Sequence, residues 1–138
     1  MSETRTLPLR NLARQGRFGA SGAAPGVTLS ILHPVSLVMV IARKGHAKKL
    51  ATVLNASRND RVMWAGPDQY YVQSETHADG ALASELKKKL ATSASVIDQS
   101  HGRVVIRISG PNARAVLAKG TPVDLHPDHF PKSKSALT

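Results

Sequence analysis

The hydrophobic positions of this sequence change their period along the chain and so predict a succession of strands and helices. Residues 27–32 alternate between apolar and polar side chains, as in a strand with one buried face. Residues 35–42 are apolar at every position except Ser36, which is typical of a central strand buried on both faces. An amphipathic helix is expected over residues 44–54, because its leucines and its lysines fall on opposite faces.

The next segment predicts a hairpin, a second helix and a further strand. Two short strands, 61–65 and 70–74, flank the turn-forming residues Gly-Pro-Asp-Gln at 66–69. A helix with a stripe of leucines follows over 79–90, with an aspartate at its first position as the expected N-cap and three lysines near its negative end. Residues 95–98 then resume the pattern of a strand.

A clean alternation over residues 103–109 predicts a half-buried strand that forms a hairpin with the preceding strand through a tight connection at Gly102. The side chains of its predicted buried face are Val104, Ile106 and Ile108. A third helix is expected over 113–119, since Pro111 suits a first helical turn and Gly120 suits a helix end.

Together these elements predict an α+β fold. From residue 35 onwards they follow the split βαβ order of ferredoxin-like domains, with extra strands at each end, a third helix, and one antiparallel sheet covered by helices on one face. We expect a flexible basic tail over 1–26, a single domain over 27–131 and a C-terminal tail over 132–138. Because residues 35–42 have no polar face, the uncovered side of the sheet should be buried by a partner.

The charge distribution points to an acidic partner. The net charge is +10, and no Asp or Glu occurs between Thr4 and Asn59. The N-terminal tail is either an arm that becomes ordered in an acidic groove of a partner or a solvated terminus, with an organelle transit peptide as a third possibility. The candidate partner-interface residues are Arg10, Arg14, Arg17, Arg103 and Arg107. The last two would share one strand face, where they meet a partner's carboxylates or phosphate or remain solvated.

Composition excludes several classes of function. The chain has no cysteine, which rules out disulfides, thiolate metal sites and a cysteine nucleophile. Its longest apolar run is far shorter than the roughly 20 residues of a membrane span, and no signal peptide opens it, so we expect a soluble cytoplasmic protein without membrane contact. It lacks glycine-rich phosphate loops for NAD, FAD or ATP. For nucleic acid it offers charge without an RNA-binding motif, so nucleic acid is not the expected partner.

Two clusters contain residue types that can support chemistry. Asp98, Ser100 and His101 include the members of a hydrolase triad, but neighbours on a strand and its turn point apart, so turn-forming roles are favoured. The second cluster consists of Asp124, His126, Asp128 and His129. These four could bind a divalent cation, whereas the prolines around them favour a surface loop whose aspartates bond backbone groups.

Residues 96–131, which read VIDQSHGRVVIRISGPNARAVLAKGTPVDLHPDHFP, resemble the gamma subunit of heterotetrameric sarcosine oxidase. The stretch Trp64-Ala-Gly-Pro-Asp-Gln69 is similar to it more loosely. The resemblance implies a fold related to the folate-binding domain of aminomethyltransferases. It also implies larger subunits that carry FAD, FMN, NAD and tetrahydrofolate and oxidise sarcosine to glycine, beside a gamma subunit that does not carry the chemistry. We therefore expect no catalytic, cofactor-binding or metal-binding residues in this chain.

One departure from that family concerns the end of the chain. The family continues past the Phe-Pro turn through a stretch resembling Cys-Ala-Gln-Thr, whereas this sequence has Ser-Ala-Leu-Thr over 135–138 and stops. The second half of the family's chain is thus missing from this sequence, which points to a shortened relative, with a whole subunit or a part of a complex acting on another N-methylated amine as the other possibilities. The alternative interpretations are a basic nucleic-acid-binding protein and a free-standing folate-dependent one-carbon enzyme. Copurification with larger subunits would distinguish a sarcosine oxidase subunit from both of these.

Overall fold

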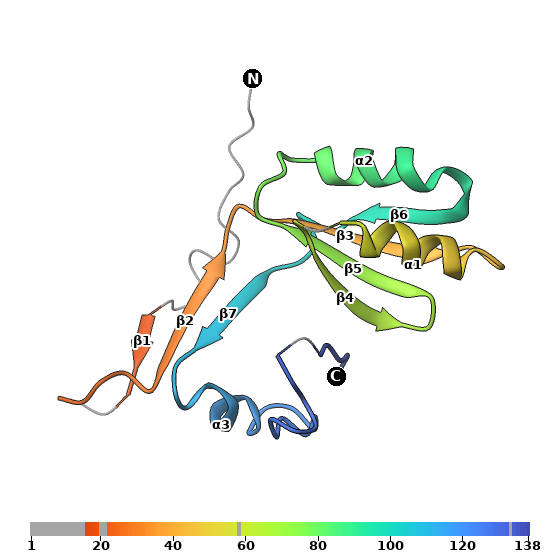
Figure 1. Ribbon diagram of the computed structural model, residues 1–138. Helices are drawn as coiled ribbons and strands as arrows, with labels where there is room; N and C mark the ends of the chain where they lie inside the picture. The colour runs from red at the N-terminus through yellow and green to blue at the C-terminus, as the bar shows by residue number, and fades with distance from the viewer. Residues whose placement is uncertain (1–15, 20–21, 58, 133) are drawn as a thin grey trace. The chain divides into compact units, whose positions relative to one another are not determined.

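The computed structural model describes residues 16–19, 22–57, 59–132 and 134–138 (Figure 1). In chain order its elements are β1 (Gly16–Phe18), β2 (Val27–Leu32), β3 (Ser36–Ala42), α1 (Ala47–Asn55), β4 (Arg61–Gly66), β5 (Gln69–Ser74), α2 (Ala81–Leu90), the short 3₁₀ helix η1 (Ala91–Ser93), β6 (Ala94–Asp98), β7 (Val105–Ser109) and α3 (Ala113–Leu117). The described residues thus combine strands and helices in one chain, as the α+β prediction requires.

The chain divides into two compact units. The first, here called the terminal unit, contains the described residues up to Pro34, those of Val104–Lys134, and Thr138. The second, here called the ferredoxin-like unit, contains Val35–Arg103 and Ser135–Leu137.

The ferredoxin-like unit has one antiparallel sheet in the order β4-β5-β3-β6. With two helices inserted after β3 and β5, this is the split βαβ arrangement that the sequence predicts. The apolar strand β3 lies inside the sheet, between β5 and β6. Asp68, at the hairpin between β4 and β5, has a φ of 57°, a left-handed conformation that aspartate tolerates better than most residues.

The core of this unit lies between the sheet and its two helices. Val38, Val40 and Val72 point from the sheet toward the helices and are fully buried. The leucines of the helices complete the cluster, namely Leu50 and Leu54 from α1 and Leu82, Leu86 and Leu90 from α2. The leucine spacing in the sequence therefore identified the buried face of both helices correctly.

The strand β3 presents apolar side chains to the opposite face of this sheet too, beside Gln69 and Gln73 of β5. Alternation along β3 turns Leu37, Met39 and Ile41 away from the helices, and Ile97 of β6, which pairs with Met39, is 42% exposed on the same face. The Arg103 guanidinium lies 5.6 Å from the ring centroid of Tyr71, the β5 partner of Met39. The absence of a polar face, expected for residues 35–42, is thus seen directly.

The terminal unit contains a three-stranded antiparallel sheet in the order β1-β2-β7. Gly26, before β2, approaches Gly110, after β7, so closely that a Cβ on Gly110 would lie 2.5 Å from the Gly26 carbonyl oxygen. The same carbonyl accepts a hydrogen bond from the Asn112 backbone amide at 3.0 Å. Gly110 also has a φ of 113°, so this position requires glycine both for conformation and for space.

Several predicted details were wrong. The strands belong to two sheets instead of one, and β6 and β7 form no hairpin, because β6 pairs with β3 while β7 pairs with β2. The local alternation of 103–109 specifies a strand but cannot specify its partner, which is distant in sequence. That strand begins at Val105, and Ile106, predicted to be buried, is 55% exposed.

The ends of some elements also differ from prediction. The strand β1 lies inside the segment 1–26 that the sequence assigns to a tail, where pairing with β2 supplies the order that local sequence lacks. The helix α2 begins after Gly80, which has a φ of 72°, and shows no side-chain cap, so Asp79 is not its N-cap. No helix in the described part of the chain is long and apolar enough to cross a membrane.

Candidate functional site

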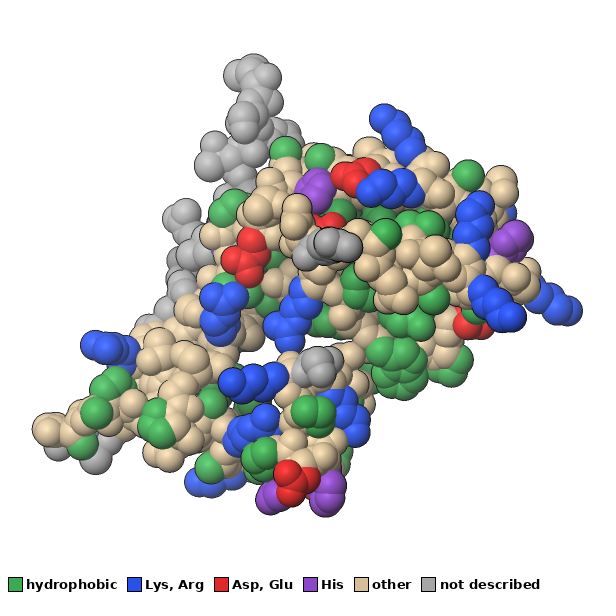
Figure 2. All heavy atoms as spheres, in the orientation of Figure 1, with side chains coloured by type: hydrophobic (Ala, Val, Ile, Leu, Met, Phe, Trp, Pro, Cys, Tyr) green, Lys and Arg blue, Asp and Glu red, His purple; other side chains and the backbone are tan. Residues whose placement is uncertain are grey.

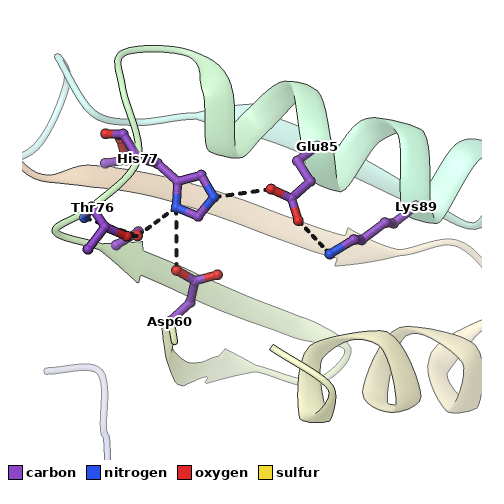
Figure 3. Close-up of polar contacts among 7 residues, drawn as sticks. Asp60, Thr76, His77, Glu85 and Lys89 are labelled. Carbon is purple, nitrogen blue, oxygen red and sulfur yellow. Dashed lines mark hydrogen bonds and ion pairs between the residues drawn. The ribbon is translucent and has the colours of Figure 1, made fainter. Parts of the chain in front are cut away.

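A network of polar side chains surrounds His77 in the loop between β5 and α2 (Figure 3). The His77 Nδ1 atom lies 2.7 Å from Ser74 Oγ and 3.6 Å from Asp60 Oδ1. Its Nε2 atom lies 3.1 Å from a carboxylate oxygen of Glu85, whose other oxygen accepts a hydrogen bond from Lys89. Since Asp60 precedes β4 and Glu85 is on α2, the imidazole connects three separate segments of the ferredoxin-like unit.

The hydrogen-bond partners define the tautomer of the neutral ring. A Glu85 carboxylate only accepts, so Nε2 carries the hydrogen, and Nδ1 accepts from the Ser74 hydroxyl. In that state the buried Asp60 Oδ1 has no hydrogen-bond donor among the residues that the structure describes. When Nδ1 is protonated as well, its N–H faces Ser74 and Asp60, and the Ser74 hydroxyl can turn to Thr76 Oγ1 at 3.2 Å.

The electrostatic effect is clearest at Glu85. The hydrogen bond from Lys89 is the largest cause that lowers the pKa of this carboxyl, and the hydrogen bond from His77 lowers it further. Partial desolvation acts in the opposite direction and is weaker. Glu85 consequently stays ionised below its ordinary range and remains an acceptor for His77 in mildly acidic solution.

The arrangement of a serine, a histidine and a carboxylate resembles a triad in composition, but its geometry serves structure. Ser74 is 2% exposed, so a substrate cannot reach its hydroxyl in this conformation. The His77 carbonyl accepts a further hydrogen bond from Ser36 Oγ at 3.3 Å. Sequence reasoning missed this network because its members are dispersed between residues 36 and 89 and share no motif.

The Asp98, Ser100 and His101 cluster adopts the turn-forming roles that the sequence favours. Ser100 Oγ donates to Asp98 at 2.5 Å, and the Ser100 oxygen accepts a hydrogen bond from the Leu37 amide at 3.0 Å. His101 instead contacts Asp79, with Nε2 lying 2.8 Å from its carboxylate. Serine and histidine thus have different partners and do not form a nucleophile and base pair.

The aspartates and histidines between 124 and 129 form a surface loop. Asp124 accepts a hydrogen bond from the His126 amide at 2.9 Å and contacts His129 Nδ1. That backbone bond is the largest cause lowering the pKa of Asp124, and the His129 side chain is the second. Within the described residues, no group of three or more histidines, cysteines and acids is placed to hold a metal ion.

Arg114 is a further residue that the sequence did not single out. From α3 its guanidinium donates to the Phe130 carbonyl oxygen at 3.0 Å and to the Leu125 carbonyl oxygen. It thereby attaches the proline-rich exit segment to the helix. Its position in an amphipathic segment gave no sign of this role.

The predicted interface arginines that the structure describes are divided between the two units. Arg17 is on β1 and Arg107 is on β7, both exposed in the terminal unit. Arg103 precedes β7 and belongs to the ferredoxin-like unit, so it does not share a strand face with Arg107 as predicted. Arg10 and Arg14 lie outside the described residues.

One end of the ferredoxin-like unit is strongly basic. The last pair of the β3–β6 ladder joins Ala42 to Ala94, and the Arg43 amide bonds the Ser93 carbonyl at 2.9 Å, so the start of α1 and the end of α2 meet there. The exposed cations of this basic end are Arg43, Lys44, Lys48, Lys49, Lys87 and Lys88. Figure 2 shows Lys and Arg side chains gathered over these two helix ends.

Comparison with known proteins gives consistent matches. The sarcosine oxidase subunit gamma of Arthrobacter sp is 35% identical over 95 residues, which cover 68% of this chain and 46% of that protein. The corresponding subunit of Corynebacterium sp. (strain P-1) is 36% identical over 87 residues, covering 62% of this chain and 42% of that protein. The chain therefore spans less than half the length of these relatives.

A solved structure and a family model agree with these relatives. The chain is similar to one chain of the heterotetrameric sarcosine oxidase from Corynebacterium sp. U-96 in complex with pyrrole 2-carboxylate, with a TM-score of 0.62, 28% identity, and coverage of 75% of this chain and 60% of that chain. The model of the sarcosine oxidase, gamma subunit family matches residues 27–137. This match includes both compact units, and the chain belongs to the sarcosine oxidase gamma subunit family.

Proposed function

We propose that this chain is an accessory, non-catalytic small subunit of a flavin-dependent complex that demethylates sarcosine oxidatively to glycine. The observation that carries the proposal is the family match over residues 27–137, which extends across the predicted domain. The His77 network supports an accessory role, since it connects segments of the fold around a serine that a substrate cannot reach. The proposal assigns the reaction to the complex and not to this chain.

The cofactors of the reaction follow from the same proposal. FAD, FMN, NAD and tetrahydrofolate would be held by the larger subunits, in the cytoplasm. The sequence of this chain has no glycine-rich loop for a dinucleotide, so it offers no obvious cradle for a pyrophosphate group. Its contribution would then be to the assembly and stability of the complex.

The arginines are proposed to bind an acidic surface of a larger subunit. Arg17 and Arg107 are exposed in the terminal unit, and Arg103 is exposed in the ferredoxin-like unit. Arg10 and Arg14 would extend the same basic character into the N-terminal segment. Such charges accelerate association with an oppositely charged surface and make it sensitive to salt.

Coexpression tests the proposal. The full chain carrying an affinity tag should retain the larger subunits of its own oxidase, and the purified complex should consume oxygen when sarcosine is added. The isolated chain should show no such turnover. An isolated chain that demethylates sarcosine by itself, or that binds folate without partners, would replace the accessory role with that of a free-standing enzyme.

The basic end favours one alternative, a nucleic-acid-binding protein, which the same material can test. Binding to duplex DNA or RNA should be weak at physiological salt and should show only the salt dependence of non-specific contacts. Tight binding that survives there, combined with failure to retain the larger subunits, would favour the nucleic-acid interpretation.

A further inference from the structure

The sheet of the terminal unit has one entirely apolar face. Directly opposed residues of antiparallel strands point to the same side, and the register pairs Phe18 with Val27, Leu29 with Ile108, and Ile31 with Ile106. We call this set the apolar face; its members are Phe18, Val27, Leu29, Ile31, Ile106 and Ile108. The other side of the same strands carries Arg17, Thr28, Ser30 and Arg107.

Two members of the apolar face are exposed in the described part of the chain. Ile106 is 55% exposed and Phe18 is 43% exposed, whereas Val27 is 7% exposed. Among the described residues of the terminal unit, Val27 is the one apolar residue that is buried. A sheet of three strands needs a packed hydrophobic face to be stable, so this face requires a cover.

The charge of the unit restricts what that cover can be. The described part of the terminal unit carries the cations Arg17, Arg107, Arg114, Lys119, Lys132 and Lys134 and the anions Asp124 and Asp128. A second copy of the chain would bring the same excess of positive charge to the contact and would be repelled. A surface with carboxylates around an apolar centre would be attracted, so charge favours an acidic partner over self-association.

We propose that the apolar face is the surface by which this chain docks onto a larger subunit of the oxidase complex. The partner surface is apolar where it covers Phe18 and Ile106, and it carries an excess of carboxylates that suits the positive charge of the terminal unit as a whole. This inference rests on the proposed function and adds to it the location of the contact. Large apolar side chains at the centre of an interface contribute most of its affinity, and rim charges contribute to the association rate.

The experiment compares the same substitution at two exposed positions. Ile106→Asp places a charge in the apolar face, and Leu137→Asp places it at a position that is 62% exposed and belongs to the ferredoxin-like unit. Each full-length variant is coexpressed with the larger subunits, and its affinity for them is measured after purification. We expect Ile106→Asp to weaken binding by on the order of tenfold or more and Leu137→Asp to leave binding unchanged.

Milder variants separate a lost contact from a misfolded unit. Ile106→Thr retains the β-branched side chain that suits a strand, and Phe18→Ser changes a different strand of the same face. Both should keep the far-ultraviolet circular dichroism of the wild type while weakening binding severalfold. If the wild type retains the larger subunits and all three face variants retain them equally well, the face is not the contact and only this inference is lost.

Two further outcomes are equally informative. A wild-type chain that never retains the larger subunits would overturn the proposed function itself, whatever the variants do. An isolated wild-type chain that forms a dimer by light scattering, and loses it in Ile106→Asp, would show that a second copy covers the face and would overturn the assignment to a larger subunit.

Discussion

His77→Ala should destabilise the ferredoxin-like unit by about 2 kcal/mol. The change removes the contact of the ring with Ser74 at 2.7 Å and its contact with Glu85 at 3.1 Å. Hydrogen bonds of this kind contribute roughly 1 kcal/mol each, and somewhat more when one partner is charged. The buried Asp60 Oδ1 atom also loses its contact with the imidazole, whose Nδ1 lies 3.6 Å away.

Two features keep this estimate from being larger. The His77 side chain is 24% exposed, so water can replace part of what the ring supplies. Ser74 keeps Thr76 as a hydrogen-bond partner at 3.2 Å, and Glu85 keeps Lys89. By the same reasoning Lys89→Ala should cost only about 0.3–0.5 kcal/mol, since it breaks an exposed pair within one helix.

Urea denaturation at neutral pH measures the effect. The single tryptophan, Trp64 on β4, reports on the ferredoxin-like unit by fluorescence. Lys88→Ala is the matched control, because this exposed neighbour takes no part in the network. A double-mutant cycle with Glu85→Gln should give a coupling energy of about 1 kcal/mol. If His77→Ala and Lys88→Ala unfold at the same urea concentration, the network does not stabilise the fold and the interpretation of His77 as a structural residue fails.

Other predictions concern the core, acid stability, salt and one glycine. Leu86→Ala should cost about 2–5 kcal/mol in the same urea assay, because this leucine is 2% exposed in the core cluster. The folded-state pKa of Glu85 is lowered, so its stabilisation is complete above its ordinary pKa of 4.5 and is lost as pH falls through the lower folded value; Glu85→Gln should unfold with less dependence on acid. Replacing both Arg17 and Arg107 with serine should slow association with the larger subunits at low salt and have little effect at high salt, which stopped-flow mixing can measure. Gly110→Ala should destabilise the terminal unit by about 1–3 kcal/mol, measured by hydrogen exchange, because its Cβ would collide with the Gly26 carbonyl.

The sequence predicted the ferredoxin-like unit well because its signals are local. The apolar run over β3, the leucine stripes of both helices and the Gly-Pro-Asp turn each depend on neighbouring residues, and each element formed close to its expected range. The pairing of β2 with β7 was missed because it joins residues about 80 positions apart in a register such as Thr28 to Ser109. Alternation indicates that a segment is a strand and says nothing of which edge it will occupy.

The residues of the candidate sites also divide into those whose roles depend on local sequence and those whose roles depend on contacts between distant segments. The turn at Ser100 could be predicted, since Asp98 bonds the amide two residues further on, which is a property of local sequence. The His77 network could not, because Asp60, Ser74 and Glu85 become neighbours only when the hairpin and α2 pack. Residue type gave little help either, since a lone histidine in a loop is seldom more than a solvated side chain.

The positive charge of the chain opposes self-association through the apolar face. An exposed sheet with an apolar face and free edges tends to associate with copies of itself. A net charge of +10 repels a second copy of the chain and attracts an acidic partner. The same charge therefore disfavours self-association and favours binding to the partner. The ferredoxin-like unit needs no such protection on its helical side, where its valines and leucines are already buried. The charge therefore acts through the terminal unit as a whole, since Arg17 and Arg107 lie on the side of this sheet opposite the apolar face.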